Sequence, residues 1–136
     1  MQAHFMLDTN ILILVRKGHT RVVTRVAELV SGLAVMSVVT FGELRLGAEK
    51  SRNRDVALKQ LGELATGIEV LALSREAAVE YSLIRADLER RGQVIGPNDL
   101  WIAAHARSAG LTLVTNNEDE FRRVPGLSVE NWAIAP

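Results

Sequence analysis

Four acidic side chains stand near the ends of predicted elements, where their carboxylates could meet. Asp8 directly follows the apolar segment 4–7, Glu43 lies in a helical segment, Asp99 begins another, and Glu120 comes shortly after the apolar segment 111–114. Two unit charges about 4 Å apart repel by roughly 4 kcal/mol at an effective dielectric of 20. Several such pairs would severely destabilise a domain whose total stability is about 5–15 kcal/mol. A divalent cation removes this conflict, and oxygen ligands favour Mg²⁺, with Mn²⁺ as a substitute, over zinc.

Each acid taken alone also has a simpler explanation. Asp8 could cap the next helix, and Glu43 could be an ordinary solvated helix residue. Asp99 could stabilise its helix by interacting with the macrodipole. Glu118 and Asp119 could be solvated loop charges, whereas Glu120, beside Phe121, is predicted to face inward. A functional site therefore requires that the four acids meet at one place.

The segment after residues 111–114 adds further polar groups. Thr115 and Asn117 could hold a water molecule or orient a carboxylate, and Asn10 could do the same beside Asp8. Basic residues after Glu43 are predicted to hold an anionic substrate, although each could equally be a solvated helix end or part of an ion pair. These are Arg45, Lys50, Arg52 and Arg54, joined by Arg16 and Lys17 after the first helix. His4, His19 and His105 lack zinc-site spacing, and His105 is predicted to be packed or exposed.

Alternating strands and helices position these residues. The predicted strands are residues 4–7, 33–36, 68–73 and 111–114, with 127–129 as a short edge strand; the predicted helices are 11–15, 20–30, 38–50, 53–66, 75–91 and 99–109. Ser74 and Asn98 are the expected N-caps of the last two helices. This order predicts an α/β fold with a mostly parallel sheet of four to five strands, covered by helices on both faces. Ligands of such sheets bind beyond the carboxyl ends of the strands.

Length and composition are consistent with one domain over residues 1–136. Apolar residues make up 48% of the chain, which is enough for a core, and the formal net charge is zero. A neutral chain does not coat nucleic acid by bulk electrostatics. The absence of cysteine excludes disulfides, thiolate zinc sites and cysteine nucleophiles. No segment has the composition of a membrane span or a signal peptide, so a cytoplasmic protein is expected.

Five sequence blocks, in order, resemble one family of nucleases. They are Met6-Leu7-Asp8-Thr9-Asn10; Gly42-Glu43-Leu44-Arg45-Leu46-Gly47-Ala48; Gly96-Pro97-Asn98-Asp99; Val114-Thr115-Asn116-Asn117 with Glu120-Phe121; and Val124-Pro125-Gly126-Leu127 through Glu130-Asn131-Trp132. Together they are similar to the PIN-domain ribonucleases and, within them, to the VapC toxins of bacterial toxin–antitoxin pairs. The similarity runs nearly the full length of the chain.

The resemblance implies that Asp8, Glu43 and Asp99 form an acidic centre, with Glu120 as the fourth acid. It assigns Mg²⁺ contacts to Asp8 and Asp99, with Glu43 acting directly or through water. Many family members carry an acid where this chain has Asn117, so Asn117 or Glu120 is left open as the fourth ligand. The implied reaction is hydrolysis of an RNA phosphodiester in which a metal-activated water attacks in line.

The resemblance also implies partners. Family members typically cut structured RNA, often transfer RNA, and the members that look nearest act on initiator transfer RNA. A VapB-type antitoxin would hold the toxin in a hetero-oligomer and provide its only link to DNA. Apolar helices at residues 48–64 and 77–88 could supply an antitoxin groove or a homodimer interface, although ordinary core packing explains the same pattern. No membrane partner is expected.

Two other classes of protein place an aspartate after a first strand. A receiver domain or phosphotransfer enzyme should carry a second Asp two residues later or an acceptor Asp after the third strand. Position 10 is Asn, and Leu73-Ser74-Arg75 contains no acid. A catalytically inactive PIN-like binding module is the other alternative. Such modules usually lose acids that this chain retains, and metal binding would separate the two cases.

Overall fold

The computed structural model, which describes residues 2–29 and 31–135, is built on a parallel five-stranded sheet with the order β3-β2-β1-β4-β5. The strands are β1 (Phe5–Leu7), β2 (Ala34–Ser37), β3 (Glu69–Leu71), β4 (Thr112–Val114) and β5 (Val129–Glu130). The helices are α1 (Thr9–Arg16), α2 (Thr20–Ala27), α3 (Val38–Glu49), α4 (Arg54–Gly67), α5 (Arg75–Arg90), α6 (Pro97–Ser108) and α7 (Glu118–Phe121). The predicted α/β architecture is confirmed.

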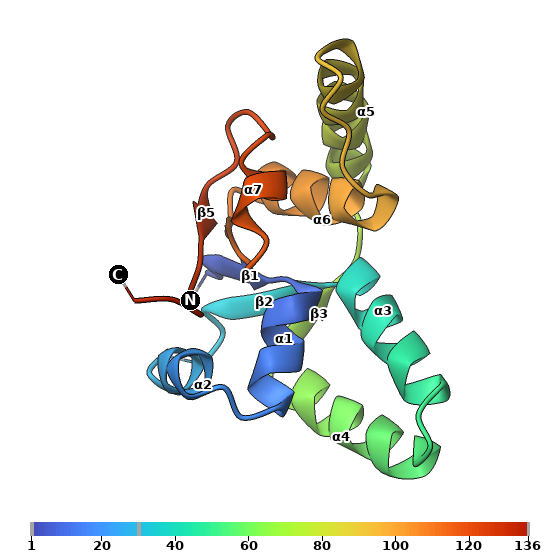
Figure 1. The fold of residues 1–136 in the computed structure, drawn as a ribbon, viewed down its shortest axis with the longest axis vertical. Helices are drawn as coiled ribbons and strands as arrows, with labels where there is room; N and C mark the ends of the chain where they lie inside the picture. The colour runs from blue at the N-terminus through green and yellow to red at the C-terminus, as the bar shows by residue number, and fades with distance from the viewer. Residues whose placement is uncertain (1, 30, 136) are drawn as a thin grey trace.

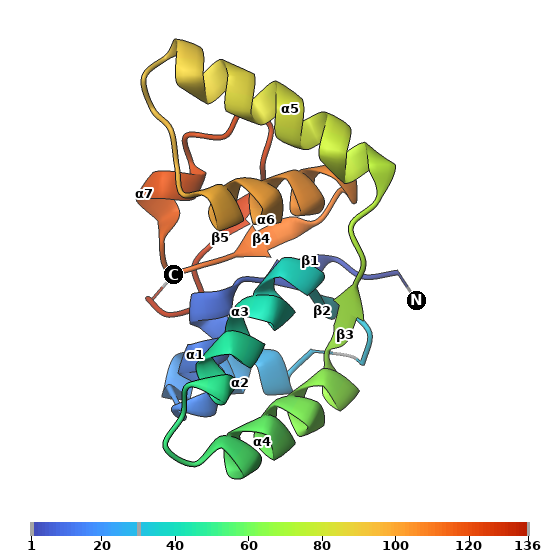
Figure 2. The same cartoon turned by 90° about the vertical axis from the view of Figure 1, so that its right-hand side faces the viewer.

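Helices cover both faces of the sheet because successive strand residues point to opposite sides. Met6 packs into one core cluster, with α5, α6 and α7, whereas its neighbour Leu7 packs into the other, with α1 to α4. The same alternation separates Leu113 from Val114 in β4. Figures 1 and 2 show the two layers, with α5 to α7 on one side of the sheet and α1 to α4 on the other.

The strand order contains a switch point next to β1. From β1 the chain moves to β2 and then β3 on one side, and later returns to β4 on the other side of β1. The pairs Leu7–Val114 and Met6–Leu113 fix the register, so β1 and β4 end side by side. Open α/β sheets bind ligands beyond the carboxyl ends of strands at such a point. Asp8 and Thr115, the residues that follow these two strands, therefore lie at the expected place.

Element boundaries differ from the prediction in informative ways. The helix expected at residues 99–109 begins at Pro97, with Gly96 as its N-cap, so Asn98 lies inside the first turn and does not cap it. Proline is favoured there because its fixed φ suits the first helical position and its missing N–H has no partner to lose. The edge strand expected at residues 127–129 forms at Val129–Glu130 instead. The helix predicted at residues 20–30 ends at Ala27, and Val30 lies outside the described residues.

The longest helix, α5, packs against α6 through its amphipathic face. Tyr81 stacks on Trp101 with ring centroids 4.0 Å apart, and Glu80 pairs with Arg107. Val79 and Leu83 are 54% and 57% exposed, so one apolar side of α5 remains uncovered. Among the described residues, no helix has both the length and the apolar composition needed to cross a bilayer.

Candidate functional site

Asp8 is buried at the switch point, with only 3% of its surface exposed. Its Oδ1 accepts the backbone N–H of Ile11 at 3.0 Å and caps α1, so the capping explanation of this residue also holds. Its Oδ2 accepts the hydroxyl of Thr115 at 2.6 Å. Burial raises the pKa of Asp8, and these hydrogen bonds oppose that rise. Each carboxylate oxygen has two acceptor sites, so the Asp8 carboxylate retains acceptor capacity for a further ligand.

Thr115 links Asp8 to the next segment of chain. Besides donating to Asp8, its hydroxyl accepts the backbone N–H of Asn117 at 2.9 Å. The Asn117 amide in turn donates a short hydrogen bond to Oε2 of Glu120, whose Oε1 accepts the backbone N–H of Gly96 at 3.0 Å. Glu120 faces inward as predicted. Asn117 therefore orients the Glu120 carboxylate through its side-chain amide, at a position where many family members carry an acid.

Glu43 approaches the same place from α3. Its Oε1 accepts the hydroxyl of Thr9 at 2.6 Å, and its Oε2 is 3.4 Å from the amide nitrogen of Asn98. Thr9 and Asn98 were not predicted as site residues. In the sequence, only their positions next to Asp8 and Asp99 could have indicated a role in the site. Their contacts with Glu43 join residues 34 and 55 positions apart, which no local pattern shows.

Asp99 completes the cluster from the first turn of α6. Burial first, and then the negative charge of Glu120, raises the pKa of Asp99 to about 7. The charges of Asp8 and Glu43 act in the same direction. Four carboxylates, one from the N-cap of α1 and one each from α3, α6 and α7, are therefore close enough to affect one another. Their mutual repulsion needs a positive charge for relief.

The donors of this cluster suit a hard divalent cation. They are oxygen atoms, and no thiolate is present. Burial raises the pKa of two of the carboxyl groups, Asp8 and Asp99, which means that their charged forms are destabilised. In the described part of the chain, no three acidic or histidine side chains already surround one point at ligand distance. Mg²⁺ fits such a site because it usually keeps several waters and takes only one or two carboxylates. Asp8 and Asp99 could hold it directly, and Glu43 and Glu120 could contact its waters.

The Thr115 hydroxyl should stabilise the charged form of Asp8, and Thr115→Val removes it while keeping the shape. We expect the free energy of unfolding at pH 7 to fall by about 1.5–3 kcal/mol, because a hydrogen bond to a buried charge is lost. Urea titration of the metal-free protein measures this. Thr112→Val in the same strand removes only a hydroxyl contact with Ser128 and should cost about 0.5 kcal/mol or less. Equal losses in the two variants would contradict a special role for Thr115.

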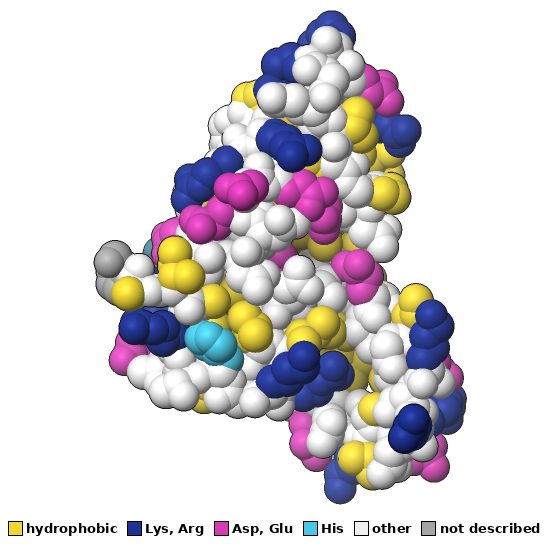
Figure 3. Space-filling model, viewed as in Figure 1, with side chains coloured by type: hydrophobic (Ala, Val, Ile, Leu, Met, Phe, Trp, Pro, Cys, Tyr) yellow, Lys and Arg dark blue, Asp and Glu magenta, His cyan; other side chains and the backbone are white. Residues whose placement is uncertain are grey.

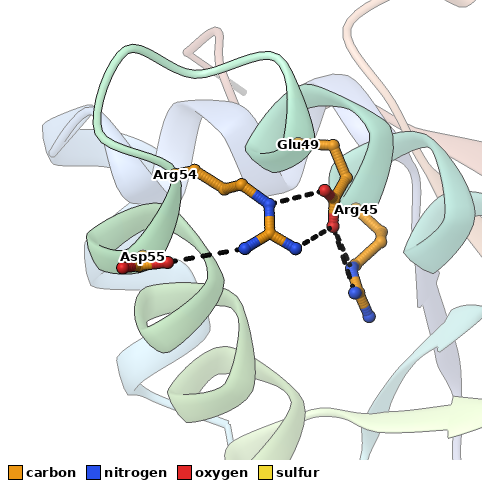
Figure 4. Close-up of polar contacts among 4 residues, drawn as sticks. All are labelled: Arg45, Glu49, Arg54 and Asp55. Atoms are coloured by element: carbon orange, nitrogen blue, oxygen red, sulfur yellow. Dashed lines mark hydrogen bonds and ion pairs between the residues drawn. The ribbon is translucent and has the colours of Figure 1, made fainter.

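The other predicted site residues lie outside this network. Arg45 pairs with Glu49 at 3.1 Å, and Arg54 pairs with the same carboxylate (Figure 4). These two arginines therefore face one another across Glu49, not the acidic cluster. The side chains of Lys50 and Asn10 are exposed; Asn10 affects Asp8 only through its backbone N–H, which lowers the pKa of that carboxyl.

His105 is packed inside the protein, in agreement with the prediction. It is 3% exposed, and its Nδ1 lies 2.8 Å from the Ser37 hydroxyl, which also caps α3. Burial lowers the pKa of His105, which favours the neutral ring. This histidine therefore ties α6 to the start of α3 and is not part of the acidic cluster.

The chain is similar to known proteins over nearly its whole length. The PIN-domain family model matches residues 5–127. The chain is 44% identical over 129 residues to the tRNA(fMet)-specific endonuclease VapC of Shigella flexneri, which covers 95% of this chain and 98% of that protein. Two crystal structures have the same fold. DNA-bound VapBC from Salmonella typhimurium has 39% identity and a TM-score of 0.92, covering 96% of this chain and 99% of the other. VapBC2 from Rickettsia felis, bound to a promoter DNA fragment, has 35% identity and a TM-score of 0.87, covering 94% and 98%.

Proposed function

The chain belongs to the PIN-domain family and, within it, to the VapC ribonucleases, and on this premise we propose that it is an Mg²⁺-dependent endoribonuclease acting as the toxin of a toxin–antitoxin pair. The observation that carries this proposal is the convergence of Asp8, Glu43, Asp99 and Glu120 at the switch point of the sheet. The substrate we propose is transfer RNA, specifically initiator transfer RNA, the substrate in the name of the Shigella relative. Such a substrate would place the enzyme in the cytoplasm.

The carboxylates would divide the chemical work. Asp8 and Asp99 would hold the cation, which when bound neutralises charge at the phosphate and acidifies a water molecule. Glu43 or Glu120 would accept the proton of the attacking water, since each has a free acceptor site beside its present hydrogen bonds. The water oxygen forms a bond to phosphorus, the bond to the 3′ oxygen breaks, and that oxygen takes up a proton. The products are a 5′-phosphate and a 3′-hydroxyl.

Interaction with a VapB-type antitoxin is the second part of the proposal. The two solved VapBC structures pair similar chains with an antitoxin, in both cases with DNA. In this chain, α1, α3 and α4 form an apolar groove of about 220 Å³ that could take an apolar segment of the antitoxin. Its apolar lining residues are Leu12, Val15, Leu44, Leu61 and Leu64. The uncovered side of α5, with Val79 and Leu83, would suit a homodimer contact.

A cleavage assay tests the proposal. Purified protein is incubated with initiator and elongator transfer RNA, with Mg²⁺, with Mn²⁺ or with a chelator, and the product ends are sequenced. We expect cleavage of the initiator species only, with both cations and never with the chelator. Products ending in a 2′,3′-cyclic phosphate, or cleavage that continues in chelator, would contradict the mechanism. A catalytically inactive PIN-like module would cut neither RNA.

A further inference from the structure

A second concave surface lies next to the acidic cluster. It is a groove of about 700 Å³ between α2 and the segment from β5 to residue 134, which we call the α2–β5 groove. Three arginines line it: Arg21 and Arg25 from α2, and Arg122 from the end of α7. In Figure 1, α2 and β5 lie on the left, whereas α3 and α4, which carry the two arginines that pair with Glu49, lie on the right. None of the predicted site residues lines the groove.

The groove lies beside the acidic cluster, at the β5 edge of the sheet. Strand β5 pairs with β4, and the backbone N–H of Thr115 donates to the carbonyl of Glu130 at 2.9 Å. Glu130, in β5, is therefore separated from Asp8, which follows β1, by the single strand β4. Helix α7 lies between the two sites. On the cluster side, Glu120 accepts the backbone N–H of Gly96. On the groove side, Glu118 accepts a hydrogen bond from Asn131 at 3.3 Å and pairs with Arg122 at 2.9 Å. In Figure 3, acidic side chains gather over α7, and basic ones lie beside them and near α2.

The arginine chemistry of the groove suits phosphate. The Arg25 guanidinium lies 4.8 Å from the centre of the Trp132 ring. A guanidinium stacked on an aromatic ring keeps the N–H groups along its edge available to donate to a phosphate. Its pairing with Glu130 is 3.7 Å long, too far for a hydrogen bond. Among the described residues Arg21 makes no ion pair, and it is exposed. Thr20, Thr24 and Asn131 add hydroxyl and amide groups of the kind that contact phosphate and sugar.

We infer that the RNA strand leaving the cleavage point binds along the α2–β5 groove, with Arg21 and Arg25 as ligands of its phosphates. This inference rests on the proposed ribonuclease function. The acidic cluster repels the phosphates on either side of the one being cut, so the strand needs cationic partners immediately beside it. An acidic peptide would also suit arginines, but the position of the groove next to the cluster favours RNA.

The test measures RNA binding in an Asp8→Asn background, which removes cleavage from the readout. Fluorescence anisotropy with labelled initiator transfer RNA gives Kd over a range of salt concentrations. Each phosphate contact contributes about 0.7 to the slope of log Kd against log salt for single-stranded nucleic acid. We therefore expect Arg21→Ala/Arg25→Ala to lower the slope by about 1.4. Arg21→Lys/Arg25→Lys should keep the slope, since the charges remain.

A matched control removes two exposed arginines from α5, as Arg75→Ala/Arg90→Ala, and should leave the slope unchanged. An unchanged slope in the Arg21→Ala/Arg25→Ala protein, or an equal change in the control, would overturn the inference. Loss of binding to a polyglutamate peptide with unchanged RNA binding would assign the groove to an acidic segment and would also overturn it. The proposed ribonuclease function is tested by cleavage with the unmodified protein, so that function and the binding of RNA in the α2–β5 groove can fail separately.

Discussion

Asp8→Asn and Asp99→Asn are each expected to lower Mg²⁺-dependent RNA cleavage by about 100-fold or more. A catalytic metal contributes several kcal/mol of transition-state stabilisation, and each 1.36 kcal/mol corresponds to a tenfold change in rate. Asparagine keeps the size of the side chain and one acceptor oxygen, so in Asp8→Asn the N-cap contact with Ile11 can persist. The measurement is the single-turnover rate on initiator transfer RNA at saturating Mg²⁺.

The matched control is Asp119→Asn, because Asp119 is exposed on α7. This substitution removes the same charge from the same end of the sheet. We expect its rate to stay within about twofold of the original protein. Circular dichroism should show that all three variants are folded. Full activity of either cluster variant would contradict the assignment of Asp8 and Asp99 to the cation.

Local pattern was sufficient to predict most of the fold. Two helices follow each of the first three strands, and this order admits few arrangements other than a parallel sheet covered on both faces. Asp8 could be placed at the carboxyl edge because it directly follows β1, and Thr115 because it follows β4. Both inferences need only the end of a strand and the rule that parallel strands end at one edge.

Contacts between distant segments could not be predicted in the same way. The Thr9–Glu43 and Asn98–Glu43 hydrogen bonds depend on the relative positions of α1, α3 and α6, which no local pattern specifies. The role of Asn117 was open for a different reason: its partner Glu120 is only three residues away, but the short helix α7 that brings the two together was not predicted. Arg45 was expected to face the substrate, but Glu49 one turn later competes for its charge.

The conflict among the carboxylates gives the cluster a cost in stability when no cation is bound. Asp99 has an ordinary pKa of 3.8 in the unfolded chain and a pKa of about 7 in the folded protein. Between these values the folded protein binds a proton that the unfolded chain does not. The contribution of Asp99 to the free energy of unfolding therefore falls as the pH rises from about 4 to about 7, and stays low above that.

Asp99→Asn should for this reason stabilise the metal-free protein at pH 8. The full pKa difference corresponds to about 4 kcal/mol, since each pKa unit is about 1.36 kcal/mol. Asp99 is only partly buried, and solvent screening reduces this figure, so we expect a gain of about 2 kcal/mol in the free energy of unfolding. Urea titration in the presence of a chelator measures it, and the gain should shrink as the pH is lowered toward 4.

Added Mg²⁺ should reverse the order of the two proteins. A ligand that binds only the folded state stabilises it by RT ln(1 + [L]/Kd), and the original protein, which keeps both carboxylates, should gain more than Asp99→Asn. Asp119→Asn should follow the original protein at every pH and Mg²⁺ concentration. If Asp99→Asn were instead less stable than the original protein at pH 8 in chelator, Asp99 would be held by favourable contacts. The same carboxylate that the chemistry requires would then not be a source of repulsion, and the electrostatic reason for a cation at this site would be lost.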